Sequence, residues 1–182
     1  MDVTFERTGE RRYAVIVSLA GQPARRFDPA PGYDDYIPHD LMHYAVEAEL
    51  GLTTGVYGRA AAGGGTFVAR ANDGASARER SRQQRRQRKR EDKLRELDEA
   101  GAKEMETSER LAALCDVAWR RRHGQRADPL RMAPQPVSAE DVVRVERVVA
   151  RLDRLSPLWR ALPVGGALAF AWPRLEPVII AG

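Results

Sequence analysis

Cysteine and long hydrophobic runs are scarce in this sequence of 182 residues. The single cysteine, Cys115, has no partner for an internal disulfide and cannot form a cysteine-based zinc site alone, which is typical of a reducing compartment. No window approaches the roughly 18 continuous apolar residues of a transmembrane helix. Residues 1–9 contain acids and no apolar signal-peptide region. We therefore expect a cytoplasmic protein without a membrane span.

Lysine is also rare, because only Lys89, Lys93 and Lys103 accompany the arginines among 30 basic residues. This bias is typical of a GC-rich bacterial genome and favours a bacterial origin. The chain has no Gly-Lys-Ser or Gly-Lys-Thr sequence, so we assign no phosphate-binding loop and no nucleotide site. A hydrophobic share of 43% and a charged share of 31% indicate a globular chain. We expect one domain over residues 1–182, with a flexible Arg-rich segment at about residues 71–90.

Alternating apolar residues at the two ends of the chain predict β-strands. The first thirty residues form two such runs around Thr8-Gly9-Glu10, which is a hairpin signal, and residues 24–28 favour a third strand. Near the C-terminus, large residues alternate with alanine after the turn at residues 163–166. The alternating residues are Val3 and Phe5, then Tyr13, Val15, Val17 and Leu19, and finally Leu168, Phe170 and Trp172.

Three helices are expected between these strands. The first runs from near Pro38, as its first residue, to Leu50 and ends at Gly51. The second begins at the caps Thr107 and Ser108 and ends near Gly124, with Leu111, Leu114, Cys115, Ala118 and Trp119 on one stripe. The third follows a linker at residues 128–136 and a Ser138–Asp141 capping box, with Val142, Val145, Val149 and Leu152 at helical spacing.

Residues 55–65 contain five glycines and predict a flexible stretch of small residues. The simplest assembly is an α+β fold. In it, a small antiparallel sheet, made of the N-terminal hairpin and the C-terminal strand, packs against three to four helices.

Two of the three histidines, His39 and His43, lie four residues apart at the start of the first expected helix. Residues at this spacing share one helix face, so both imidazoles can approach one divalent cation, with zinc as the first choice. Glu47 continues the row, but eight helical residues span roughly 12 Å, which is too far for one ion. The third ligand should therefore come from elsewhere in the chain. Asp34, Asp35 and His123 qualify by chemical type alone.

Asp40 follows the first histidine, as the glutamate base does in the HExxH pattern of metalloproteases. One alternative is therefore a metal-dependent hydrolase in which Asp40 acts as the general base. The aspartate side chain is shorter and reaches less far than glutamate.

The sequence carries two resemblances on this helix. The Pro-His-Asp-Leu-x-His pattern from Pro38 to His43, after a hairpin, resembles a family of bacterial proteins over most of the chain, and that family implies no activity. Residues 39–43 are also similar to the HDxxH zinc motif of the family that organises ubiquinone biosynthesis on lipid membranes. In that family a glutamate twelve residues after the second histidine completes the site, and Gly55 stands at that position here.

A purely structural interpretation remains open for the same residues. In it, His39 and His43 are partly buried, one of them hydrogen-bonds near Asp34 or Asp35, and Glu47 lies on the solvent face. The protein is then a structural or partner-binding module, and neither its oligomeric state nor its partner follows from the sequence.

A block of basic residues precedes a block of acidic ones. Residues 78–90 carry a net charge of +7, whereas residues 91–109 carry −5. The basic block predicts nonspecific binding of a polyanion, either a nucleic acid or an acidic protein partner, although no aromatic residue is interleaved for base stacking. The alternative is a solvated loop that the acids balance. The candidate polyanion-binding residues are Arg78, Arg82, Arg85, Arg86, Arg88, Lys89 and Arg90, with Arg80 in the same block.

Overall fold

A computed structural model describes residues 1–63, 98–127 and 137–182 of the chain. These parts contain a five-stranded antiparallel sheet and four helices, so the predicted α+β fold is confirmed. The linker prediction for residues 128–136 and the flexible segment predicted at about residues 71–90 lie outside the described residues. The strands are β1 (Asp2–Gly9), β2 (Arg12–Ser18), β3 (Arg25–Phe27), β4 (Ala167–Ala171) and β5 (Val178–Ile180), and the helices are α1 (His39–Leu50), α2 (Val56–Ala61), α4 (Asp98–Arg122) and α5 (Ala139–Ala161).

The two ends of the chain meet in the sheet, whose strand order is β3-β2-β1-β4-β5. The hairpin partner of Phe5 in β2 is Val15, and its partner in β4 is Leu168. The prediction that the C-terminal strand joins the N-terminal hairpin is therefore confirmed. The short strand β5 was not predicted from the sequence.

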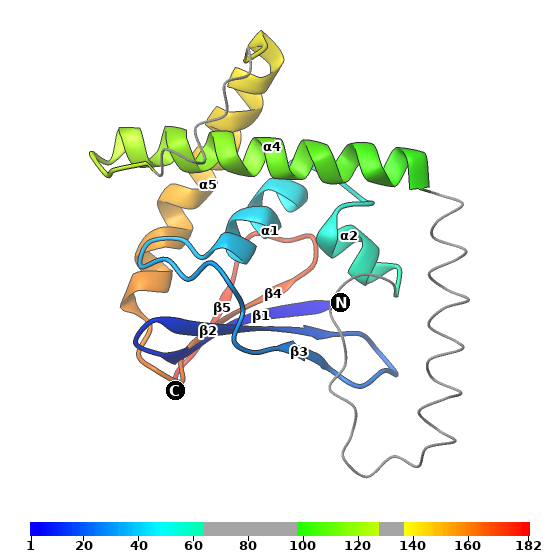
Figure 1. Cartoon of the computed structure of the whole chain (residues 1–182). Coiled ribbons are helices and arrows are strands. Elements are labelled where there is room, and N and C mark those ends of the chain that lie inside the picture. Colours follow the sequence, from blue (N-terminus) through cyan, green and yellow to red (C-terminus); the bar gives the residue numbers. More distant parts are fainter. Residues whose placement is uncertain (64–97, 128–136) are drawn as a thin grey trace.

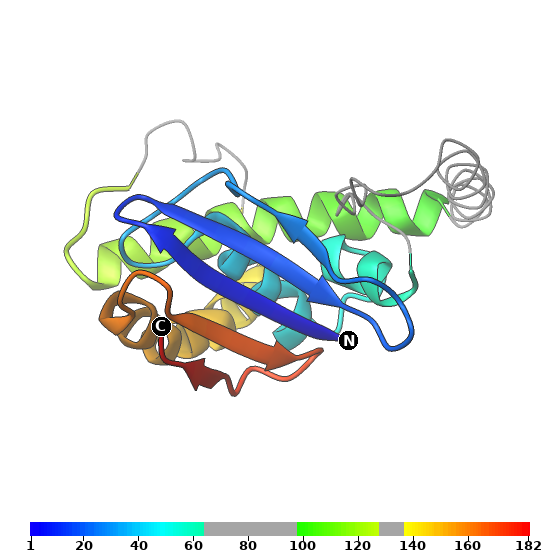
Figure 2. The same ribbon diagram turned by 90° about the horizontal axis from the view of Figure 1, so that it is seen from below.

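One face of the sheet carries the core, and the helices lie on that face (Figure 1). The inward side chains Val3, Phe5, Tyr13, Val15 and Leu168 are all 0% exposed, as the alternation predicts. Figure 2 shows the opposite face with no described helix in front of it. Trp172, the last residue of the predicted alternating run, lies just beyond the end of β4.

Helix α1 lies between the sheet and α4, which crosses its outer side (Figure 1). This position explains why seven consecutive residues of α1, from Leu41 to Glu47, are buried. The helix ends where the sequence predicts, because Gly51 adopts a left-handed conformation with φ of 67°. Pro38 is the residue before the helix, with extended ψ of 148°, so the prediction that it is the first helical residue was wrong by one position.

Helix α4 is already helical at Asp98, the first described residue of this part of the chain, about two and a half turns before the predicted start. Thr107 and Ser108 are not caps but interior residues, and Ser108 is 0% exposed. Residues 102–106 are strong helix formers. Gly101 lies close to α2, because a Cβ atom there would be 2.6 Å from the guanidinium of Arg59. The expected stripe is confirmed for Leu111, Cys115 and Trp119, which are at most 3% exposed, whereas Leu114 and Ala118 are partly buried.

Helix α5 has the predicted capping box. The backbone N–H of Asp141 donates to Ser138 Oγ at 3.0 Å, and the backbone N–H of Ser138 donates to Asp141 Oδ2 at 3.4 Å. Arg110 of α4 donates to both oxygens of Asp141, at 2.7 and 3.0 Å, and so joins the two helices. Val142 is 51% exposed, so its place on the apolar stripe was wrong, whereas Val148, which was not predicted, is 0% exposed and belongs to the buried face.

Helix α2 occupies part of the stretch for which the sequence predicts flexibility. Its first backbone N–H groups, of Val56 and Tyr57, donate to the carboxylate of Glu47 at 2.8 Å each. A side chain on α1 therefore caps α2, which no local pattern in the glycine-rich sequence reveals.

Candidate metal centre

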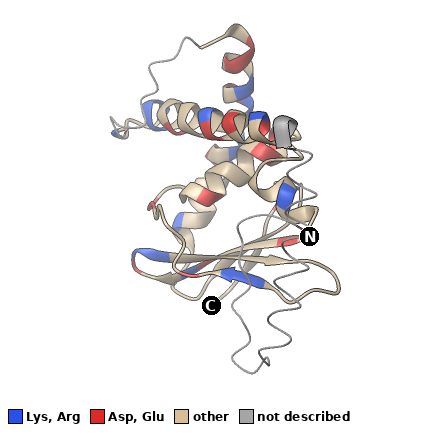
Figure 3. Ribbon diagram, turned by 45° about the vertical axis from the view of Figure 1, so that its right-hand side comes forward, with Lys and Arg blue, Asp and Glu red and all other residues tan. Residues whose placement is uncertain are grey.

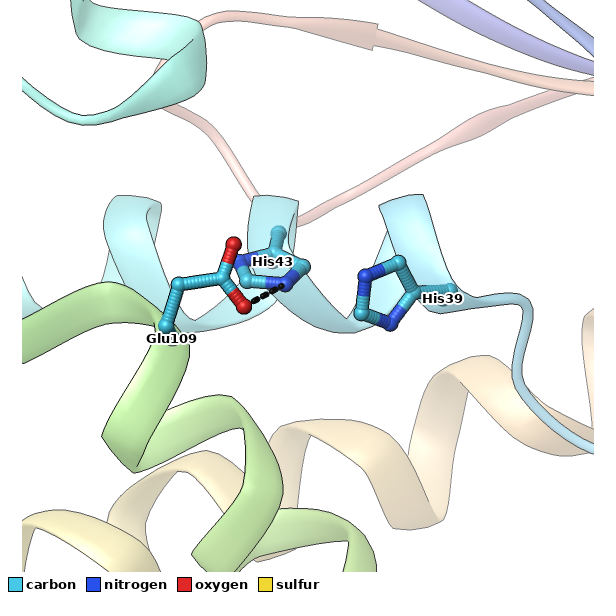
Figure 4. Close-up of side chains that lie close together, drawn as sticks. All are labelled: His39, His43 and Glu109. Atoms are coloured by element: carbon cyan, nitrogen blue, oxygen red, sulfur yellow. Dashed lines mark ion pairs between the residues drawn. The ribbon is translucent and has the colours of Figure 1, made fainter. Parts of the chain in front are cut away.

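His39 and His43 of α1 lie beside Glu109 of α4 (Figure 4). Each of the three side chains offers one ligand atom, and these atoms all lie within 4.8 Å of one another. The two imidazole rings are 4.5 Å apart between centroids, as the spacing of one helical turn predicts. Among the residues that the structure describes, these three are the one group of histidine, cysteine or acidic side chains that lie close enough together to hold a metal ion.

The third member of this cluster is not one of the three candidates named from the sequence. Asp34 accepts a hydrogen bond from Arg120 at 2.6 Å, Asp35 accepts one from Tyr33, and His123 pairs with Asp153 at 2.8 Å. None of these candidates belongs to the cluster.

Glu109 belongs to the acidic block of residues 91–109 and, before the fold is known, nothing distinguishes it from its neighbours. The packing of α4 across α1 alone brings it to the histidines. Sequence reasoning could not select it, because the contact joins residues far apart in the chain.

His43 is a buried histidine, 3% exposed, whose two nitrogens face different groups. Its Nδ1 lies 3.0 Å from Ser108 Oγ, and the Ser108 hydroxyl donates to Glu47 Oε1 at 3.0 Å. Its Nε2 is buried and makes no hydrogen bond, and lies 3.5 Å from Glu109 Oε2. The nitrogen that faces the cluster is therefore the one without a hydrogen-bond partner.

Glu47 is 0% exposed, so the interpretation that places it on the solvent face was wrong. Its oxygens accept three hydrogen bonds, from Ser108 and from the backbone of Val56 and Tyr57. This is the pattern of an ionised carboxylate, although burial raises the pKa of Glu47. A Cβ atom at Gly55 would lie 2.4 Å from the carboxyl carbon of Glu47, so glycine permits this close approach.

Glu109 is the exposed member of the cluster, with a side chain that is 60% exposed. The neighbouring imidazole of His43 lowers the pKa of the Glu109 carboxyl, so a carboxylate is favoured there. In a tetrahedral zinc site, with bonds of about 2.0–2.2 Å, neighbouring ligand atoms are roughly 3.4 Å apart. The distance of 3.5 Å between His43 Nε2 and Glu109 Oε2 fits this value.

Asp40 is not one of the three side chains of the cluster. Its Oδ2 lies 2.6 Å from the hydroxyl of Tyr13, which is also 2.6 Å from the carbonyl oxygen of Pro31. Burial raises the pKa of Asp40, and the hydrogen bond with Tyr13 opposes this effect. The role of Asp40 as a general base stays a prediction.

The basic residues predicted to bind a polyanion, at positions 78–90, lie outside the described residues. In the described part of α4, basic and acidic residues are mixed along the helix (Figure 3). The described charges of α4 and α5 also pair with each other, as Arg122 does with Asp153. Polyanion binding by the basic block therefore stays a prediction.

No family model, no curated protein and no solved structure matches the chain. The resemblances to the bacterial family and to the HDxxH motif therefore stay predictions. No helix among the described residues is long and apolar enough to cross a membrane.

Proposed function

We propose that this protein binds one divalent cation, with zinc as the first choice, through His39, His43 and Glu109. Two imidazoles and one carboxylate are ligands that zinc takes in proteins. His43 Nε2 carries the proposal, because it is buried without a hydrogen bond and faces the Glu109 carboxylate at 3.5 Å. An unprotonated Nε2 and a carboxylate oxygen are both acceptors, so a positive charge between them is needed to hold them together, and without one the exposed Glu109 side chain can turn into solvent.

That positive charge is either a metal ion or a proton on His43. A protonated His43 would form an ion pair with Glu109. A cation would bind all three side chains, because His39 lies one helical turn from His43 and the centroids of the two rings are 4.5 Å apart. A binding measurement distinguishes the two arrangements.

The site is suited to an ion that stays accessible to water. Three protein ligands leave one position of a tetrahedral site open, and the exposure of Glu109 places that position near the surface. The same ion would link α1 to α4, because its ligands come from both helices. We restrict the proposal to cation binding, since the carboxylate of Asp40 is engaged with Tyr13.

The test is elemental analysis of protein purified without an affinity tag and loaded with zinc. We expect about one zinc per chain in the wild-type protein and little in the double variant His39→Ala, His43→Ala. The control is His123→Ala, which removes the third histidine, paired with Asp153 outside the cluster. Equal zinc in all three proteins, or none in the wild-type protein, would refute the proposal.

A further inference from the structure

A chain of three buried polar side chains extends behind the proposed metal site. Glu47 and Ser108 are 0% exposed, and His43 is 3% exposed. We infer that Ser108, oriented by Glu47, is a positioning residue that fixes the neutral imidazole of His43 with its proton on Nδ1, which leaves the Nε2 lone pair for a cation. This inference rests on the proposed function, because it assigns Ser108 and Glu47 a role in binding the same ion.

The direction of the hydrogen bonds follows from counting protons. Both oxygens of Glu47 accept a backbone N–H of α2, and Oε1 also lies 3.0 Å from Ser108 Oγ. A carboxylate has no proton to give, so the hydroxyl of Ser108 donates to it. Ser108 has only that one proton. Its oxygen must therefore accept from His43 Nδ1, which lies at 3.0 Å.

The position of this proton decides which nitrogen can bind a metal. A neutral imidazole carries one N–H, and when it is on Nδ1 the lone pair is on Nε2. Nε2 is the nitrogen that faces Glu109 and makes no hydrogen bond. Groups that orient a metal-bound histidine in this way typically contribute 10–100-fold to metal affinity.

A purely structural explanation makes a different prediction. Ser108 also satisfies the buried Glu47, which caps α2, so removing its hydroxyl can weaken the fold without any effect on His43. The proton position on His43 separates the two explanations. It is read from long-range proton–nitrogen NMR correlations of the imidazole in the metal-free wild-type protein, without any substitution.

The experiment combines this spectrum with zinc affinity. We expect the Nδ1–H tautomer of His43 in the metal-free wild-type protein, its loss in Ser108→Ala, and zinc binding that is 10–100-fold weaker in that variant. Ser108→Thr keeps the hydroxyl and should recover most of the affinity. The control is Thr107→Ala, whose hydroxyl donates to the carbonyl of Lys103 in the same helix and should leave both readouts unchanged.

Three outcomes would overturn the inference, and they can be told apart. A wild-type His43 that is protonated on Nε2, or on both nitrogens, contradicts the proposed proton position even if Ser108→Ala fails to fold. A folded Ser108→Ala variant that binds zinc as tightly as the wild-type protein contradicts the positioning role while leaving the proposed function intact. A wild-type protein with the Nδ1–H tautomer that binds no zinc refutes the proposed function, and the positioning role with it.

Discussion

The substitution Glu47→Gln tests the buried hydrogen-bond network directly. In the wild-type protein the Glu47 carboxylate accepts three hydrogen bonds, two of them from the backbone N–H groups of Val56 and Tyr57. An amide has one acceptor oxygen and one NH2 donor. In either orientation, at least one backbone N–H therefore faces another donor in a site that is 0% exposed.

The expected cost follows from that unpaired group. A buried donor without an acceptor costs about 1–3 kcal/mol, and each kcal/mol lowers the melting temperature of a domain of this size by about 2–4 °C. We therefore expect Glu47→Gln to lower the free energy of unfolding by about 1–3 kcal/mol. The assay is urea unfolding of the metal-free protein, together with a thermal melt.

The matched control is Glu106→Gln, at an exposed position of α4. Surface substitutions of this kind usually change stability by less than about 0.5 kcal/mol. If Glu47→Gln changes the free energy of unfolding no more than Glu106→Gln does, Glu47 is not the acceptor for α2. The proton count that leads from Glu47 to Ser108 and His43 would then be wrong.

Two further predictions concern the helices that carry the site. Hydrogen bonding from Arg110 holds the pKa of Asp141 well below its ordinary value of about 3.9. The ionised Asp141 therefore stabilises the fold above its ordinary pKa, and this contribution is lost as the pH falls toward its lowered pKa in the folded protein. Between pH 7 and pH 2, the urea midpoint should fall less steeply for Asp141→Asn than for the wild-type protein. In the core, Leu152→Ala should lower the free energy of unfolding in urea by about 2–5 kcal/mol, because Leu152 is 0% exposed. Val143→Ala, at a site that is 61% exposed, should change the free energy of unfolding by less than about 0.5 kcal/mol. Equal effects of the last two substitutions would contradict the described orientation of α5.

Local sequence patterns predicted the parts of the fold that depend on local physics. The hairpin follows from alternation, the end of α1 from Gly51, and the start of α5 from the Ser138–Asp141 box. In each case the residues that form the feature lie within a few positions of one another. The helical spacing of His39 and His43 is a feature of the same kind.

The remainder of the site depends on contacts between distant segments. Glu109 and Ser108 reach the histidines only because α4 packs across α1, and α2 is capped by a carboxylate from α1. The sequence offered one indirect signal, since Glu47 continues the row of His39 and His43 on the face that turned out to be buried. Its charge suggested solvent exposure, whereas the backbone donors of α2 explain its burial.

The most direct test of the metal site is a calorimetric zinc titration of the wild-type protein and of Glu109→Gln, with Glu106→Gln as the control. Glu109 is the candidate ligand that the fold brings to the two histidines, and glutamine keeps the shape of its side chain while removing the charge. We expect one zinc per chain in the wild-type protein and in Glu106→Gln, and binding at least about 10-fold weaker in Glu109→Gln. Equal affinity in all three proteins, or no binding by the wild-type protein, would contradict a metal site formed by His39, His43 and Glu109.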